Sequence, residues 1–292
     1  MILKKTNKLN NITDINIKCE DAFELSGTLY NPMIIKAAIM IAPATGIKKQ
    51  FYDPFAKFLS DNGYGVLTFE NRGIGDSKGN SINGVNASLV NWGKLDMTAV
   101  LEKLKHVFPN VDYHLIGHSA GGQLVGLMKN AKELKTIFNY GSSSGSLKYS
   151  KYPFRLKSSF WLNFYIPVSN FLFGHTKSQW VGMGEPLPKL VASEWSRWCN
   201  GKGYLKVDLD DSIKEHLYDE LTLKSMWLHA EDDEIANYEN VKDMIRVYSK
   251  ITANIITLSP EKHGYKEIGH MKFFSFKRKK LWDFALNWLK EN

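Results

Sequence analysis

The sequence has few of the residues that mark secreted or metal-binding proteins. Only two cysteines occur in 292 residues, Cys19 and Cys199. They lie too far apart for the spacing of metal ligands, and no cluster of His, Cys and Asp has that spacing either. We therefore expect no metal site. Two unpaired thiols are typical of a reducing compartment, which predicts a cytoplasmic protein.

Long hydrophobic runs are also missing. The N-terminal stretch 1–8 lacks the extended apolar core of a signal peptide. No stretch reaches the roughly 18 uncharged apolar residues that a membrane span requires. The chain contains no internal repeat and no low-complexity segment. We therefore expect a globular protein with no integral membrane segment.

The chain carries a formal charge of +8. Its basic residues are widely spread, with one cluster at 277–280 that is interleaved with aromatic residues. This pattern predicts the solvated face of a terminal helix, and we expect no nucleic-acid partner. The charge allows peripheral contact with an anionic membrane surface. The sequence predicts no oligomeric state.

Apolar runs and amphipathic segments alternate over most of the chain, which predicts an α/β fold with a mostly parallel sheet covered by helices on both faces. The expected strands cover 12–19, 23–30, 37–42, 66–69, the run into Gly117, 136–140, 225–230 and 254–258. The expected helices cover 51–61, 92–107, 120 to about 131, 238–249 and the end of the chain from about 272. The first two strands alternate in polarity and predict an antiparallel edge.

The alternation breaks after Gly141. Residues 142–215 are rich in aromatic side chains, and sheet elements resume after them. This predicts a helical cap at 142–215, inserted between two parts of one core at 1–141 and 216–292. Trp195 and Trp198 are three residues apart and would share one helical face. We consider two roles for them: walls of an apolar substrate pocket, or ordinary core packing.

The stretch Gly117-His118-Ser119-Ala120-Gly121 joins an apolar run to a helix-compatible run. Such a turn can hold a serine in a strained backbone conformation with its hydroxyl projecting. Glycines are needed two residues before and after it, since side chains there would collide with the neighbouring strand and helix. Ser119 is therefore the candidate nucleophile, although a purely structural turn has the same pattern.

A serine needs a base, and the base needs an acid that orients it. In this order of elements the acid should follow a strand and the histidine should follow the last strand. Asp232 and Asp233 follow the strand at 225–230 and are both candidates, unless they only cap the next helix. His263 and His270 follow the last strand. We favour His270, because His263 lies in a charged loop typical of solvated residues.

The oxyanion of a tetrahedral intermediate needs two amide donors. The first candidate is the N–H of Ala120, directly after the nucleophile. The second is expected in the loop at 43–46, directly after a buried strand, and Thr45 is our choice. The alternative is that Pro43 and Gly46 form an ordinary turn.

With these residues in hand, the chain resembles an α/β-hydrolase over nearly its whole length. More narrowly, it is similar to a bacterial group near the serine-aminopeptidase and lysophospholipase-like hydrolases. The motifs that carry the resemblance are the Gly-x-Ser-x-Gly-Gly at 117–122, Arg-Gly-x-Gly-x-Ser at 72–77, Pro-Ala-Thr-Gly at 43–46, Leu-Pro at 187–188, Trp-x-Arg-Trp-Cys at 195–199, Asp-Asp-Glu at 232–234 and Gly-His-x-x-Phe-Phe at 269–274.

This resemblance implies the α/β-hydrolase fold, with Ser119 as nucleophile, Asp233 as acid and His270 as base. Asp233 is preferred because the residues after it match those after the family's acid. One departure is Pro43-Ala44, where many family members carry His-Gly. That departure leaves the second oxyanion donor open.

These observations predict a serine hydrolase that acts on a small-molecule carboxylic ester with an apolar acyl or alkyl group, without a cofactor. A peptidase or amidase with the same triad is the first alternative. It would need cap carboxylates to bind a peptide N-terminus, and 142–200 contains only Glu185 and Glu194. A non-catalytic binding module is the second alternative, against which the complete set of Ser, Asp and His argues.

Overall fold

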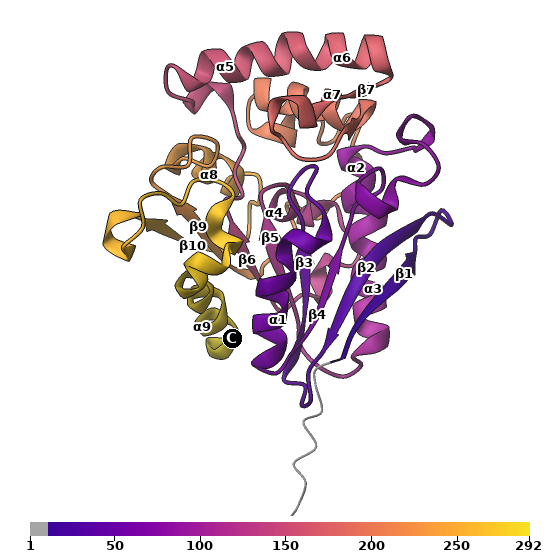
Figure 1. The fold of residues 1–292 in the computed structure, drawn as a ribbon, viewed down its shortest axis with the longest axis vertical. Coiled ribbons are helices and arrows are strands. Elements are labelled where there is room, and N and C mark those ends of the chain that lie inside the picture. The colour runs from indigo at the N-terminus through magenta and orange to yellow at the C-terminus, as the bar shows by residue number, and fades with distance from the viewer. Residues whose placement is uncertain (1–10) are drawn as a thin grey trace, which may run out of the picture.

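The computed structural model describes residues 11–292, which form an eight-stranded sheet flanked by helices (Figure 1). The strand order is β1-β2-β4-β3-β5-β6-β9-β10. The strands are β1 Asn11–Lys18, β2 Glu24–Asn31, β3 Ala37–Ala42, β4 Tyr64–Phe69, β5 Tyr113–His118, β6 Thr136–Tyr140, β9 Lys224–Ala230 and β10 Thr252–Leu258. β2 runs antiparallel to β1 and β4, and the strands from β4 to β10 are parallel. The expected α/β class and the antiparallel edge are confirmed.

Helices cover both faces of this sheet. The α-helices are α1 Asp53–Asp61, α2 Leu89–Asn91, α3 Thr98–Val107, α4 Ala120–Gln123, α5 Phe154–Phe160, α6 Ile166–Phe173, α7 Lys189–Asn200, α8 Tyr238–Ile245 and α9 Trp282–Glu291. α1 and α9 pack on one face, and α3, α4 and α8 pack on the other. No helix of residues 11–292 is long and apolar enough to cross a membrane. The signal-peptide prediction for 1–8 lies outside the described residues.

The alternation of side chains along a strand explains why the central strands are apolar throughout. In β3, Ile39 and Ile41 enter the core under α1 and α9, whereas Met40 enters the core under α3. Successive side chains point to opposite faces, so a strand with helices on both faces needs apolar residues at every position. The continuous run at 37–42 predicted this burial correctly.

The strand register brings four chain segments to one edge of the sheet. Ala42, at the end of β3, pairs with Gly117 of β5, and Leu258, at the end of β10, pairs with Ala230 of β9. The loops after these strands therefore leave the sheet side by side. This edge is the carboxyl end, where parallel sheets bind their ligands.

Helices α5, α6 and α7 lie over this carboxyl end (Figure 1). A π-helical segment, Trp161–Tyr165, joins α5 to α6, so that residues 154–173 form one continuous helix. The short strands β7 His175–Thr176 and β8 Leu187–Pro188 pair between α6 and α7. Division of the chain at 141/142 and 215/216 stays a prediction.

The helix after Gly117–Gly121 is much shorter than the sequence predicted. We expected it to reach about 131, but α4 ends at Gln123. The hydroxyl of Tyr218 donates to the Gln123 carbonyl at 2.7 Å, and that of Tyr248 donates to the Gly122 carbonyl at 2.9 Å. The segment around Tyr218 also packs against Gly126, where a Cβ would lie 2.4 Å from the tyrosine ring. Distant residues therefore occupy the space that a longer helix would need.

The last helix also differs from its prediction. It begins at Trp282 and not near Lys272. The preceding residues form two 3₁₀ segments separated by Ser275, whose backbone is extended. The buried Phe273 fixes this path, since its carbonyl accepts the indole N–H of Trp282 at 2.9 Å. The basic cluster at 277–280 therefore lies in a 3₁₀ segment before the terminal helix.

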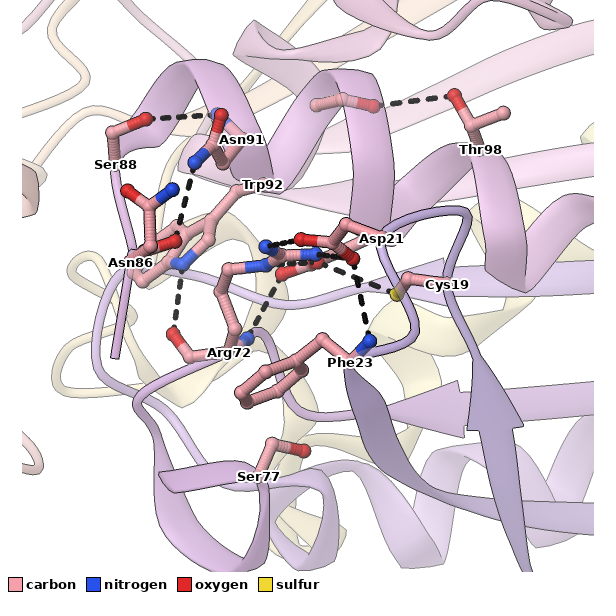
Figure 2. Close-up of polar contacts among 12 residues, drawn as sticks. Cys19, Asp21, Phe23, Arg72, Ser77, Asn86, Ser88, Asn91, Trp92 and Thr98 are labelled. Carbon is pink, nitrogen blue, oxygen red and sulfur yellow. Dashed lines mark hydrogen bonds and ion pairs between the residues drawn. The ribbon is translucent and has the colours of Figure 1, made fainter. Parts of the chain in front are cut away.

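A buried ion pair connects the edge strands to the helical layer (Figure 2). The Arg72 Nε donates to Asp96 Oδ1 at 2.6 Å, and its two terminal nitrogens donate to Asp21 at 2.6 and 3.1 Å. Arg72 and Asp96 are both almost fully buried. Burial raises the pKa of the Asp96 carboxyl, and the Arg72 charge opposes this rise. Asp21 lies between β1 and β2, and Arg72 lies in the loop after β4. The guanidinium of Arg72 therefore attaches the β1–β2 hairpin to that loop.

We expect Arg72→Met to lower the free energy of unfolding by about 3–5 kcal/mol, because it leaves Asp96 buried without its partner. The matched control is Arg246→Met, which removes an exposed arginine paired with Asp243. That change should cost about 1 kcal/mol or less. Urea unfolding followed by circular dichroism gives both values. Equal losses would contradict a special role for the buried pair.

Candidate active site

Ser119 lies in a tight turn between β5 and α4. Its backbone has φ +50° and ψ −113°, a conformation that non-glycine residues rarely adopt. A Cβ on Gly121 would lie 2.1 Å from the Ala42 carbonyl oxygen, and one on Gly117 would lie 2.6 Å from the Gly122 nitrogen. The requirement for glycine at both positions is therefore confirmed, and the cause is close packing of β3, β5 and α4.

The structure brings Ser119, His270 and Asp233 together. The Nε2 atom of His270 lies 3.0 Å from the Ser119 Oγ, and its Nδ1 lies 2.8 Å from the Asp233 Oδ2. Ser119 and His270 are 151 positions apart in the chain. These contacts form a continuous chain from carboxylate to imidazole to hydroxyl, which is the geometry needed to remove the serine proton.

Asp233 is fully enclosed, and its environment favours the carboxylate. Burial alone would raise the pKa of Asp233. The charge and hydrogen bond of His270 outweigh this effect together with the amides of Ala236 and Ile235, which donate to Oδ1 at 2.8 and 2.9 Å. The pKa of Asp233 is lowered as a result. An ionised Asp233 can fix the Nδ1–H tautomer of His270.

Asp232 and His263, the other candidates for the acid and the base, contact groups other than Ser119 and the imidazole of His270. Asp232 accepts the backbone amides of Ile268 and Gly269 at 2.8 and 3.0 Å, so it holds the loop that carries His270. His263 packs against the ring of Phe284. The two neighbouring aspartates thus contact different parts of the same loop, one its backbone and the other the imidazole.

The buried His118 connects three loops of the site. The Nε2 of His118 lies 3.0 Å from the His270 backbone carbonyl, and its Nδ1 lies 2.9 Å from the Tyr52 hydroxyl. The Tyr52 hydroxyl in turn accepts the backbone amide of Ala44 at 2.9 Å. The turn of Ser119, the His270 loop and the loop after β3 are therefore joined by one chain of hydrogen bonds.

The partners in this chain determine where the protons lie. A carbonyl can only accept, so the Nε2 of His118 donates to His270. The neutral Nδ1 then accepts from Tyr52, which leaves the tyrosine oxygen free to accept from Ala44. Burial, with the nearby charge of His270, lowers the pKa of His118 to about 3. His118 therefore stays neutral at physiological pH and keeps this pattern.

The amide donors near Ser119 fall into two groups. The Ala44 amide is occupied by Tyr52. Among residues 11–292, the amides of Thr45 and Ala120 donate no backbone hydrogen bond, whereas that of Ala44 donates to the Tyr52 hydroxyl. The oxyanion role of Thr45 and Ala120 stays a prediction.

The two cap tryptophans occupy different environments. Trp198 is fully buried, its ring packs against Tyr204, and its indole N–H donates to Asp208. Trp195 is half-buried and packs edge-on against Trp161. These contacts favour core packing for Trp198. A substrate-binding role for either side chain stays a prediction.

The two acidic residues of 142–200, Glu185 and Glu194, are already engaged. Glu194 accepts the amides of Leu89 and Val90 at 2.6 and 3.4 Å, at the start of α2. Burial raises the pKa of Glu194, although these amides oppose the rise. Glu185 pairs with Lys48 at 3.3 Å. Both carboxylates therefore hold the cap to the core.

The sequence alone did not single out Tyr52 or His118 as residues that connect the loops of the site. Nothing in the spacing of residues 44, 52 and 118 indicates that they meet. The aromatic Phe51 and Phe274 also pack around His118.

Residues 11–292 contain no group of three His, Cys, Asp or Glu side chains placed to hold a metal. Both cysteines in this part of the chain are buried and unpaired.

Comparisons with solved structures place this geometry in a known fold. A soluble variant of monoglyceride lipase from Saccharomyces cerevisiae, solved with a substrate analogue, has a TM-score of 0.68 at 14% identity, covering 98% of this chain and 95% of the lipase. A carboxyl esterase from Bacillus coagulans has a TM-score of 0.63 at 10% identity and coverage of 97% and 99%. An esterase from Pyrococcus furiosus has a TM-score of 0.58 at 16% identity and coverage of 97% and 93%.

Sequence comparison gives a shorter match. No curated protein sequence matches this chain. Residues 33–157 match the family described as serine aminopeptidase, S33, a segment that contains both the loop after β3 and the turn of Ser119. The strand order and the similarity to these solved structures show that the chain has the α/β-hydrolase fold, and its residues 33–157 are similar to the serine aminopeptidase family.

Proposed function

We propose that the protein is a serine hydrolase of carboxylic esters. The observation that carries this proposal is the chain of contacts from Asp233 through His270 to Ser119, at 2.8 and 3.0 Å. The esterases and the lipase with the same fold support it, although at low identity. Fold alone does not define a reaction, so the argument rests on the site.

The reaction follows from the positions of these side chains. His270 takes the proton of the Ser119 hydroxyl as the oxygen attacks the ester carbonyl. The negative charge on the carbonyl oxygen is stabilised by the amides of Ala120 and Thr45. His270 then returns its proton to the leaving alcohol, and an acyl group remains on Ser119. Water, activated by the same imidazole, releases the acid.

A peptidase or amidase is the second candidate, because the matching family is described as a serine aminopeptidase. Such an enzyme needs a carboxylate that is free to bind the ammonium group of a peptide. Glu194 is committed to two backbone amides, and Glu185 to Lys48. We therefore favour esters as the substrate class.

The Ser119→Ala variant should remain folded and lose about 10⁴-fold or more in kcat. The reason is that the imidazole then has no hydroxyl to activate. Hydrolysis of p-nitrophenyl butyrate measures the loss, and covalent labelling by a fluorophosphonate should vanish in parallel. Turnover like that of the wild type would contradict the assignment, and absence of labelling in the wild type would favour a non-catalytic binding module.

The two neighbouring aspartates should differ in their effects. Asp233→Asn should reduce kcat by about 10⁴-fold, because an amide stabilises the wrong imidazole tautomer. Asp232→Asn should cost less, since it weakens only the backbone contacts of the His270 loop. Parallel kinetics on one ester give the ranking. The reverse order would identify Asp232 as the acid.

Tyr52→Phe should lower kcat about tenfold with little change in KM, an effect of about 1.4 kcal/mol on the barrier. Loss of the hydroxyl releases both the Ala44 amide and the His118 ring, so the loop of Thr45 is no longer held in place. Tyr113→Phe is the control, because its hydroxyl bonds to the Phe108 carbonyl at the opposite end of β5. Equal effects of the two changes would remove Tyr52 from the positioning role.

The length of the acyl chain should affect the rate if an apolar pocket receives it. Each buried methylene contributes about 0.8 kcal/mol, so kcat/KM should rise roughly threefold or more per carbon until the pocket is full. A series of p-nitrophenyl esters from acetate to decanoate measures this profile, with aminoacyl amides for comparison. A steady decline from acetate would argue against such a pocket, and faster amide cleavage would favour the peptidase.

A further inference from the structure

The continuous helix at 154–173 has an apolar face that points away from the protein. We call this face the cap stripe, and it consists of Leu156, Phe160, Phe164, Val168, Phe171 and Leu172, all exposed. Phe171 is 86% exposed, and Phe160 and Phe164 are each 57% exposed. Trp161, Leu162 and Ile166 lie on the opposite side of the helix and are buried. The exposed aromatic residues are therefore additional to those that hold the helix in place.

The helices α5 and α6 that carry the cap stripe lie at the outer edge of the molecule, above the carboxyl end of the sheet (Figure 1). The members of the stripe recur at four-residue intervals from Leu156 to Leu172, with Phe171 beside the last of them. Exposed apolar residues that occur singly need no explanation, but a row of them along one helix marks an interaction surface. Trp180 is also exposed and packs against Phe173 next to the end of this row.

The charge of the segment that carries the cap stripe has one sign. Residues 142–184 contain no Asp or Glu, although the whole chain has 30 acidic residues. The same stretch carries five basic residues, namely Lys148, Lys151, Arg155, Lys157 and Lys177. Lys148, Lys151, Arg155 and Lys157 are exposed. The ammonium group of Lys177 lies over the rings of Phe173 and Trp180, at 4.4 and 4.6 Å from their centres.

We propose that the cap stripe docks on the surface of an anionic lipid bilayer. A helix that lies flat on a membrane places Phe, Trp and Leu among the acyl chains and Lys and Arg among the headgroups, which is the arrangement of this segment. Anionic headgroups attract each nearby basic side chain, and here no acidic side chain of residues 142–184 opposes them. The proposal does not depend on ester hydrolysis.

The charge also decides between a bilayer and a second copy of the chain. A symmetric dimer through this face would place the same five basic residues against themselves, with no acidic residue of this stretch to neutralise them. A bilayer supplies the missing negative charge and the apolar phase at the same time. It also accepts an apolar row without shape complementarity, which a protein partner would have to provide.

The test is co-sedimentation of the full chain with extruded vesicles. One set contains phosphatidylcholine only, and the other contains about one third phosphatidylglycerol. We expect the partition coefficient to be about tenfold or more higher on the anionic vesicles, and to fall in about 0.5 M NaCl, where surface charges are screened. Phe160→Ser with Phe164→Ser should lower it by about tenfold or more, because two large apolar side chains are lost.

The control pair is Met33→Ser with Ile34→Ser, which changes two residues that are 73% and 78% exposed between β2 and β3. This pair should bind vesicles as the wild type does. Lys151→Gln with Lys157→Gln should weaken binding to the anionic vesicles only. Circular dichroism and thermal unfolding establish that each variant is folded.

Three results would overturn the proposal. The first is a wild type that binds no vesicles. If that protein is instead retained on poly-glutamate, its partner is an acidic protein. The second is unchanged vesicle binding by the folded Phe160 and Phe164 variant. The third is a lipid-free dimer, seen by light scattering, that this variant converts to a monomer, because the stripe would then be a subunit interface.

Discussion

The positive φ angle of Ser119 is the constraint around which the site is arranged. It places the hydroxyl at the carboxyl edge of the sheet, but it can exist only if neighbouring backbone approaches very closely. Gly121 therefore lies against the carbonyl of Ala42, and the Ser119 amide donates to the Tyr140 carbonyl at 3.0 Å. A strained backbone conformation persists only when the surrounding contacts hold it in place. Here strands on both sides of β5 supply that restraint, which explains why the turn and the sheet register depend on each other.

Two histidines near this turn, His118 and His270, have different surroundings. His118 is enclosed by Tyr52, Phe51 and Phe274, so that burial keeps it neutral and makes it a fixed connection between backbone groups. His270 instead contacts the Asp233 carboxylate through its Nδ1 and the Ser119 hydroxyl through its Nε2. His118 thus holds the backbone of His270 in place through the hydrogen bond to its carbonyl. It does so without adding a charge to the site.

The cap contributes two faces with different physical properties. Its inner side is attached to the core through Glu194 at the start of α2 and through Glu185, whose amide donates to the Gly46 carbonyl at 2.8 Å. Gly46 directly follows Thr45, so the cap also contacts the loop in which we predict an oxyanion donor. Its outer side combines exposed aromatic residues with basic charge. A displacement of the cap would therefore change the contacts of the loop after β3.

Local pattern determined much of this protein. The continuous run at 37–42 and the alternating edge strands predicted the sheet, and Gly117-x-Ser119-x-Gly121 predicted the strained turn, because these features depend on residues close in sequence. Tertiary structure decided the rest. Tyr218 and Tyr248 end α4 at Gln123 by occupying its carbonyls, and only the register of β9 and β10 turns Asp233 toward His270 while Asp232 holds its loop. The contact of Tyr52 with His118 spans 66 positions. These outcomes depend on which residues, far apart in the sequence, pack together in the interior. The spacing of residues along the chain does not predict such contacts.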